Sequence, residues 1–230
     1  MKALDKSKII RFDFPESQYY AEATNKKQVY LHHTVSPNNP QGVENWWEAT
    51  PEHVAVSILI ARDGTICQLF SSNHWAYHLG LSADIFKKYH LPYISLDRIS
   101  IGIEILCWGA LTKGVNGKYY PIKWDSVNKT VIPNYRSGYV EDVQLYDEGF
   151  RGFYAFERYT DEQIESVRQL LVFWNQKFNI PLDYHDDIWD ISTRALSGEA
   201  GIYCHTSVRL DKSDCHPQPE LINMLKSLKQ

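Results

Sequence analysis

The segment 99–106 constrains the fold most, because it reads Ile-Ser-Ile-Gly-Ile-Glu-Ile-Leu and alternates apolar with small or polar residues. Successive side chains of a strand point to opposite faces, so this period of two predicts a β-strand with one apolar face. Ser100, Gly102 and Glu104 then share the other face. A carboxylate in such a strand is costly unless it is paired or functional, and the strand alone leaves a buried salt bridge and a catalytic base equally open for Glu104.

Strands and helices are mixed along the rest of the chain. Residues 62–65 contain Asp-Gly, a strong hairpin turn, between two apolar runs. Residues 160–163 form a capping box, and helical spacing of apolar residues follows as far as Phe178. This mixture predicts an α/β fold, a single domain with a central mixed β-sheet flanked by helices. The predicted strands are residues 28–34, 54–61, 66–70, 99–106 and 201–205, and the predicted helices are residues 160–178 and 219–228.

Length and composition also favour one domain. A chain of 230 residues with 43% hydrophobic content can bury one good core. Residues 1–27 are polar and mixed, and we expect them to form an N-terminal arm on a main domain of residues 28–228. Residues 109–158 are rich in Gly, Tyr, Asn and Lys without a helical period, which predicts an insertion of loops and short strands.

Charge and hydropathy exclude several classes of partner. The net charge is −4 and no dense basic patch occurs, so nucleic acid is not expected as a partner. No run of 18 apolar residues is present and the apolar stretch near the N-terminus is too short for a secretory signal, so we expect no membrane span and synthesis in the cytoplasm. We expect a monomer. The four cysteines, Cys67, Cys107, Cys204 and Cys215, form no CxxC pair, so we expect reduced thiols.

Two histidine-bearing segments could build a metal site. His32 and His33 end a predicted strand, where only one of two neighbours can face a given site; alone, they could be polar caps. His205 precedes Asp214 by nine residues and Cys215 by ten, a loop long enough to return a second ligand. Two histidines with a carboxylate or thiolate suit catalytic zinc, which keeps its fourth position for water. Asp214 and Cys215 both remain open as the third ligand.

Three further residues are candidates of lower weight. His78 lies among aromatic residues before a glycine, where a partly buried polar tip is a common arrangement. Lys212 precedes Asp214 by two residues, and a surface Lys-Asp pair is the plainer interpretation. His185 is the reserve metal ligand.

Together these motifs resemble the zinc-dependent N-acetylmuramoyl-L-alanine amidases, a family that includes phage lysozyme-like amidases, anhydro-muropeptide amidases and peptidoglycan recognition proteins. The similarity covers roughly residues 28–107 and 159–228, and five motifs occur in the family's order. They are His32-His33-Thr34, the Arg-Asp-Gly hairpin of residues 60–65, Ala76-Tyr-His78-Leu-Gly80, Ser100-Ile-Gly-Ile-Glu104 and Lys212-Ser-Asp214.

The resemblance implies a role for each of these residues. Residues 28–228 would form an amidase catalytic domain that hydrolyses the amide between N-acetylmuramic acid and L-alanine in peptidoglycan or muropeptides. The metal ligands would be His32, His205 and Asp214, with Cys215 as the alternative to Asp214, and the cofactor would be Zn²⁺. Glu104 would be the base, Lys212 would stabilise the oxyanion, and His78 and Trp75 would contact substrate.

The chain also departs from the family pattern. Residues 54–57 lack the usual His or Tyr, and Cys215-His216 replaces the common Pro-Gly after the ligand. A non-catalytic peptidoglycan-binding module on the same fold therefore remains the alternative, and a structural zinc site closed by Cys215 is a third hypothesis. We expect either an endolysin-like enzyme for cell wall degradation, released to the wall in the phage manner, or a cytoplasmic recycling enzyme.

Overall fold

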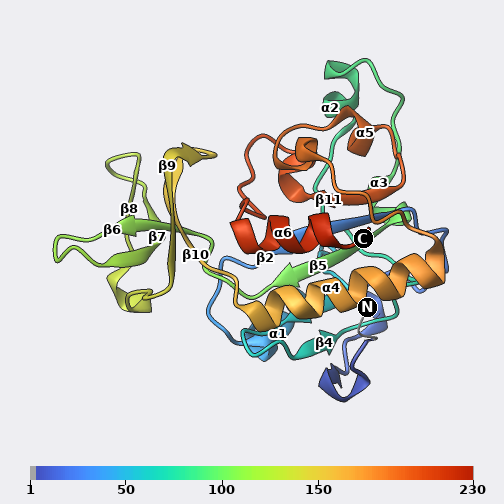
Figure 1. Cartoon of the computed structure of the whole chain (residues 1–230), viewed down its shortest axis with the longest axis horizontal. Helices are drawn as coiled ribbons and strands as arrows, with labels where there is room; N and C mark the ends of the chain where they lie inside the picture. The colour runs from blue at the N-terminus through green and yellow to red at the C-terminus, as the bar shows by residue number, and fades with distance from the viewer. Residues whose placement is uncertain (1–3, 230) are drawn as a thin grey trace.

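A six-stranded sheet forms the centre of the protein in the computed structural model, which describes residues 4–229. The strand order is β1-β4-β3-β5-β2-β11; β3 and β4 pair antiparallel and the other neighbours pair parallel. The prediction of a mixed central sheet with helices against it is confirmed (Figure 1). The strands are β1 (Ile9–Arg11), β2 (Gln28–His33), β3 (Ile58–Ile60), β4 (Ile66–Gln68), β5 (Ser100–Ile105) and β11 (Gly201–Cys204).

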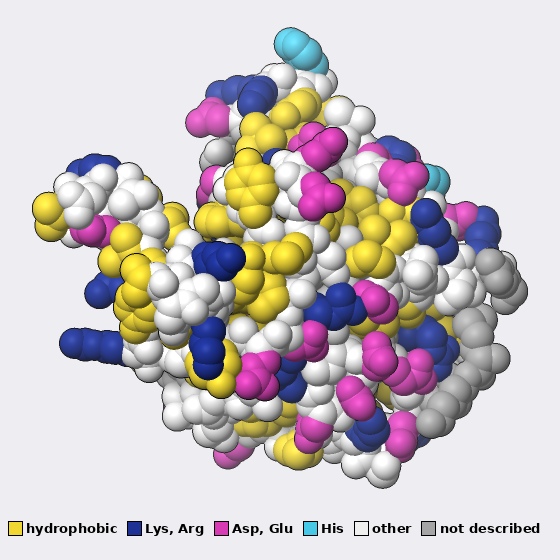
Figure 2. Space-filling view, turned by 60° about the vertical axis from the view of Figure 1, so that its left-hand side comes forward, with side chains coloured by type: hydrophobic (Ala, Val, Ile, Leu, Met, Phe, Trp, Pro, Cys, Tyr) yellow, Lys and Arg dark blue, Asp and Glu magenta, His cyan; other side chains and the backbone are white. Residues whose placement is uncertain are grey.

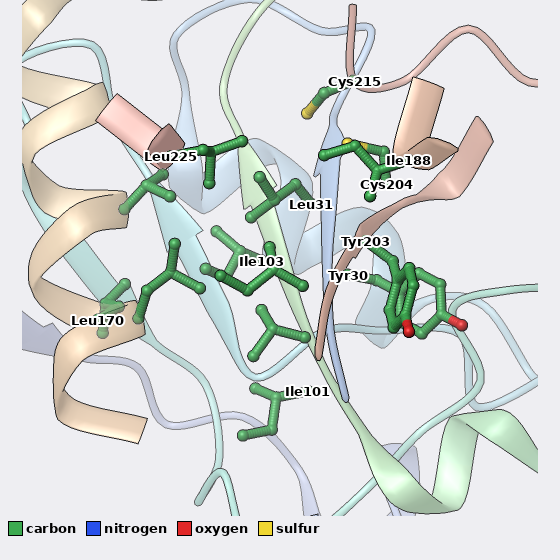
Figure 3. Packing of buried hydrophobic residues seen from close by; sticks show 14 of the residues in the cluster. Tyr30, Leu31, Ile101, Ile103, Leu170, Ile188, Tyr203, Cys204, Cys215 and Leu225 are labelled. Atoms are coloured by element: carbon green, nitrogen blue, oxygen red, sulfur yellow. The ribbon is translucent and has the colours of Figure 1, made fainter. Parts of the chain in front are cut away.

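Two helices cover one face of this sheet, α4 (Asp161–Phe178) and α6 (Pro219–Ser227). Figure 3 shows Leu170 of α4 and Leu225 of α6 beside Leu31 and Ile103, and all four are buried in the same cluster. Tyr30 lies on the opposite side of the strands, as the period of two requires. The even-numbered residues of β2 therefore face away from α4 and α6.

Helix α4 is fixed by its sequence at both ends. Thr160 and Gln163 form the predicted capping box, and Asn179 ends the helix with φ of +58° in the left-handed region, two residues before the proline at position 181. The Gln163 amide also donates to the carbonyls of Ile60 and Leu106, at 3.2 and 2.9 Å. These bonds attach the start of the helix to β3 and to the end of β5.

The described part of the N-terminal segment adds an edge to the central sheet. Strand β1 pairs parallel with β4, so that Ile9 lies opposite Ile66. Farther on, Tyr20 forms a β-bridge with Trp75, and the two rings stack with centroids 4.0 Å apart. Polar composition gave no sign of this pairing, because the partners lie more than 50 residues away.

The insertion forms a second sheet of five antiparallel strands, which projects to one side in Figure 1. Its strand order is β8-β7-β6-β10-β9. The last three residues of β10 are buried, whereas Trp124 of β7, Leu145 of β9 and Tyr154 of β10 are exposed. The strands are β6 (Ala110–Lys113), β7 (Tyr119–Asp125), β8 (Thr130–Pro133), β9 (Val143–Phe150) and β10 (Phe153–Glu157).

Some elements differ from the sequence prediction. Residues 54–61 contain a strand of only three residues, because Val54 forms an isolated bridge with Tyr77 before β3 begins. A helix that was not predicted, α1 (Pro40–Glu48), follows β2; its first residue is proline, and the side chain of Asn39 caps it. The remaining helices are α2 (Ala83–Lys88), α3 (Leu96–Ile99) and α5 (Thr193–Leu196).

Charge is distributed without large patches on the face shown in Figure 2. Lys and Arg side chains there alternate with Asp and Glu rather than forming one basic surface. Within residues 4–229, no helix has the length and apolar character needed to cross a bilayer.

Candidate metal centre

Three neighbouring parallel strands bring the predicted site residues to one level of the sheet. His32 of β2 is in register with Glu104 of β5. On the other side of β2, Cys204 of β11 is in register with Leu31, so His205 follows at the level of His32. The carboxyl ends of parallel strands are a common place for functional side chains.

His32, His205 and Asp214 form a compact buried cluster. The two Nδ1 atoms of His32 and His205 are 3.0 Å apart, and Asp214 Oδ2 lies 3.1 and 3.0 Å from them. A tetrahedral zinc with bonds of about 2.0–2.1 Å separates its ligand atoms by roughly 3.3 Å, close to this triangle. Two imidazole nitrogens and a carboxylate oxygen form a donor set that binds zinc and related divalent metals. The cluster fits a metal ion, and the predicted ligand set is brought together.

The outer nitrogen of each histidine has a partner that leaves Nδ1 free to bind a metal. His205 Nε2 is 3.0 Å from the carbonyl oxygen of Leu79, which can only accept, so Nε2 carries the proton. His32 Nε2 lies 3.0 Å from His78 Nδ1, and His78 Nε2 lies 2.9 Å from Ser100 Oγ. If His32 Nε2 carries a proton, it donates to His78 Nδ1, and His78 Nε2 donates to Ser100 Oγ. Such partners orient metal-binding histidines.

Asp97 holds the segment that supplies both partners. Its Oδ1 accepts the backbone N–H groups of His78 and Leu79, at 2.8 and 3.0 Å. Gly102 gives the His78 ring room, because a Cβ there would lie 2.5 Å from Val56 Cγ1 and 3.1 Å from His78 Nδ1. No sequence motif pointed to Asp97 or to the Leu79 carbonyl, whereas the period of two placed Ser100 and Gly102 on the face of Glu104.

Burial and mutual charge set the protonation of the cluster. Burial lowers the pKa of His32 to about 4, and the neighbouring His205 acts in the same direction. Burial alone would raise the pKa of Asp214, but His205 and His32 hold it well below its usual range. Neutral imidazole and ionised carboxylate are the forms that bind a metal.

Glu104 and Lys212 lie beside the cluster. Burial raises the pKa of Glu104 well above its usual range, Asp214 adds to the shift, and Lys212 opposes it. The residue is partly exposed, but its Oε2 atom is buried and has no hydrogen-bond partner among the described residues. A buried salt bridge was the alternative to a catalytic base for Glu104, and no ion pair of this carboxylate is found in residues 4–229.

A hollow of about 620 Å³ opens over these residues. One wall comes from α1 and includes Trp46, which is 63% exposed, and the buried Trp47. The floor includes His78, Glu104 and Asp214. A mostly apolar hollow with a few convergent polar groups is typical of a binding site for a small molecule or chain segment.

Other candidate residues lie elsewhere. Cys215 is fully buried in the hydrophobic cluster and is not part of the metal cluster. Trp75 donates to Glu22 Oε2 at 3.1 Å and does not line the hollow. His185 is exposed before a 3₁₀ turn. Substrate contact by Trp75 and His78 stays a prediction.

Comparisons with known proteins identify the family of the chain. A family model described as N-acetylmuramoyl-L-alanine amidase matches residues 22–217. The chain therefore belongs to the N-acetylmuramoyl-L-alanine amidase family. No curated protein sequence gives a significant match.

Solved structures of this fold are similar to the chain at low identity. N-acetylmuramoyl-L-alanine amidase LysC from Clostridium intestinale has 14% identity and a TM-score of 0.49, over 94% of this chain and 96% of that one. Drosophila peptidoglycan recognition protein SA has 12% identity and a TM-score of 0.43, over 93% and 84%. At these scores the similarities add nothing to the family assignment.

Proposed function

We propose that the protein is a zinc-dependent amidase that hydrolyses the bond between the lactyl group of N-acetylmuramic acid and L-alanine in peptidoglycan or its fragments. One observation carries the proposal: in a chain of the amidase family, the buried cluster of His32, His205 and Asp214 lies beside an unpartnered Glu104 carboxylate and opens to a hollow. Zinc held by these ligands would supply a water of lowered pKa and polarise the scissile carbonyl.

Glu104 is the proton carrier in this proposal. Its buried Oε2 has free lone pairs, and burial brings the pKa of Glu104 closer to neutral pH than the pKa of an exposed carboxylate. A base of this kind takes a proton from the attacking water and delivers it to the amine that leaves with L-alanine. The water oxygen bonds to the carbonyl carbon, the amide C–N bond breaks, and the proton moves from water through Glu104 to the leaving amine.

Lys212 and Trp46 are proposed to stabilise the transition state and to contact the substrate. The Lys212 ammonium lines the hollow and can stabilise negative charge on the carbonyl oxygen in the transition state. The exposed ring of Trp46 offers an apolar surface to a sugar or peptide segment in the same hollow.

The test is digestion of purified peptidoglycan and of soluble muropeptides, with mass analysis of the products. We expect free stem peptides that begin with L-alanine, and a loss of about 10²- to 10⁴-fold in rate for Glu104→Gln with the metal retained. Glu48→Gln, on the exposed end of α1, is the control and should cleave as the wild type. Tight binding of muropeptides without release of stem peptides would instead establish a non-catalytic binding module.

A further inference from the structure

Two of the three metal-ligand candidates lie on a segment outside the sheet. His205 begins a 3₁₀ turn directly after β11, and Asp214 follows nine residues later without intervening helix or strand. One backbone bond closes this loop, from the Thr206 N–H to the Asp214 carbonyl at 3.1 Å. The spacing of the two ligands therefore depends on whatever else holds residues 205–216.

The hairpin of β9 and β10 contacts the first part of this segment through Arg151. Arg151 Nη2 donates to the Thr206 carbonyl at 3.1 Å and to Asp190 Oδ1 at 2.9 Å. Longer contacts reach the carbonyls of Leu210 and Trp189, at 3.5 and 3.4 Å. Thr206 is thus held on both sides, by Asp214 through its N–H and by Arg151 through its carbonyl.

The backbone at the tip of the hairpin indicates that Arg151 is there for its side chain. Arg151 has φ of +50° and Gly152 has φ of +85°, so both central residues of the turn lie in the left-handed region. Asn, Asp and Gly are the usual residues at such positions because other side chains are strained there. The Arg151 side chain is only 13% exposed, in contrast to the free tip of an ordinary hairpin.

The same hairpin holds the other end of the segment through Tyr146. His216 Nε2 is 3.1 Å from the Glu157 carbonyl, which can only accept, so this nitrogen carries the proton. Tyr146 therefore donates its hydroxyl proton to His216 Nδ1, at 2.7 Å. The His216 ring is fully buried and stacks on Phe156 of β10 with centroids 4.7 Å apart.

We propose that the β9–β10 hairpin of the insertion sets the spacing of two metal ligands, with Arg151 and Tyr146 as positioning residues at the two ends of residues 205–216. The inference rests on the metal centre of the proposed function. It gives the insertion a role at the site although no insertion residue lines the hollow within the described chain. The hairpin acts through backbone groups and His216, and touches neither the ligand atoms nor substrate.

Metal affinity of the folded protein tests this inference. Zinc dissociation constants would be measured by competition with a chelator for the wild type, Arg151→Ala and Tyr146→Phe. Loss of partners that orient metal ligands weakens binding by about 10- to 100-fold, and we expect Arg151→Ala near this range and Tyr146→Phe below it. Arg136→Ala and Tyr154→Phe are the matched controls, because both side chains are exposed on the same insertion.

The readouts separate positioning from general stability. A purely stabilising role would lower the free energy of unfolding of the metal-free protein and leave zinc affinity of the folded fraction unchanged. Wild-type affinity in both Arg151→Ala and Tyr146→Phe would overturn the inference. If Arg151→Ala does not fold, Tyr146→Phe decides, since it removes one hydroxyl group.

Failure of the proposed function gives a different pattern. A wild type that binds zinc but releases no stem peptides would contradict the amidase proposal, and the affinities of the variants would still decide the role of the hairpin. A wild type that binds no zinc would overturn both.

Discussion

The two sheets of the protein differ in what they bury. Every residue of β2 in the central sheet is buried, whereas β9 of the insertion has no buried residue. The central sheet packs against α4 and α6 and carries His32 and Glu104 on its other face. Within residues 4–229, the insertion sheet makes its hydrogen bonds to residues 205–216 through its β9–β10 hairpin. One sheet therefore builds the site, and the other is expected to adjust it.

The largest expected effect comes from the site on the central sheet. Asp214→Ala removes one of three ligands from a buried cluster and should abolish metal binding at micromolar zinc, with loss of at least about 1,000-fold in hydrolysis. Asp211→Ala, three residues away and exposed beside Arg209, should leave both unchanged. Metal analysis and peptidoglycan digestion check this pair; equal metal content in the two variants would contradict the ligand assignment.

Leucine substitutions compare the sheets themselves. Leu31→Ala opens a cavity in the central core and should lower the free energy of unfolding by about 2–5 kcal/mol. Leu145→Ala on β9, where the side chain is 54% exposed, should change it by less than about 0.5 kcal/mol. Urea unfolding of both variants checks this. Similar losses would show that the insertion contributes to stability as much as the central sheet.

How much the sequence revealed also differs between the sheets. Strands β2 and β5, the hairpin that joins β3 to β4, and helix α4 were predictable, because their apolar periods, turn residues and caps are local signals. The motifs likewise predicted His32, His205, Asp214 and Glu104, which the structure brings together.

The other features depend on contacts between distant residues, which no local pattern encodes. The pairing of β1 with β4, the placement of His78 behind His32, and the bond from Arg151 to Thr206 are of this kind. The insertion was the least predictable region because its strands are half exposed and lack a clean apolar period. The left-handed backbone of Arg151 and Gly152 is likewise a feature that only the structure shows.

Acidification should destabilise the central region of the metal-free protein. Burial lowers the pKa of both His32 and His33 to about 4, below the unfolded value near 6.5. The unfolded chain therefore binds more protons between these values, and stability falls as pH drops from about 7 to 4, by roughly 3 kcal/mol at most for each histidine.

The raised pKa of Glu104 acts in the opposite direction, so the measurement uses Glu104→Gln. Urea unfolding of that variant at several pH values checks the slope. A free energy of unfolding that is constant from pH 7 to 4.5 would contradict the buried, neutral state of the histidines.

The smallest effect is expected behind the metal cluster. His78→Gln removes the ring that accepts from His32 Nε2 and should weaken zinc binding by about 10- to 100-fold while the three ligands remain. His185→Gln is the control, because that ring is exposed and outside the cluster. Chelator competition distinguishes the two. A larger loss of zinc affinity in His185→Gln than in His78→Gln would indicate that His185 is a metal ligand and would contradict the assignment of His205.

The most direct test of the account is zinc titration of the metal-stripped wild type, with release of L-alanine-terminated stem peptides followed in the same samples. The cluster of His32, His205 and Asp214 predicts saturation at one zinc per chain and hydrolysis that rises in proportion to occupancy. Hydrolysis by the stripped protein, or no saturable zinc binding, would contradict a metal-dependent amidase built on this cluster.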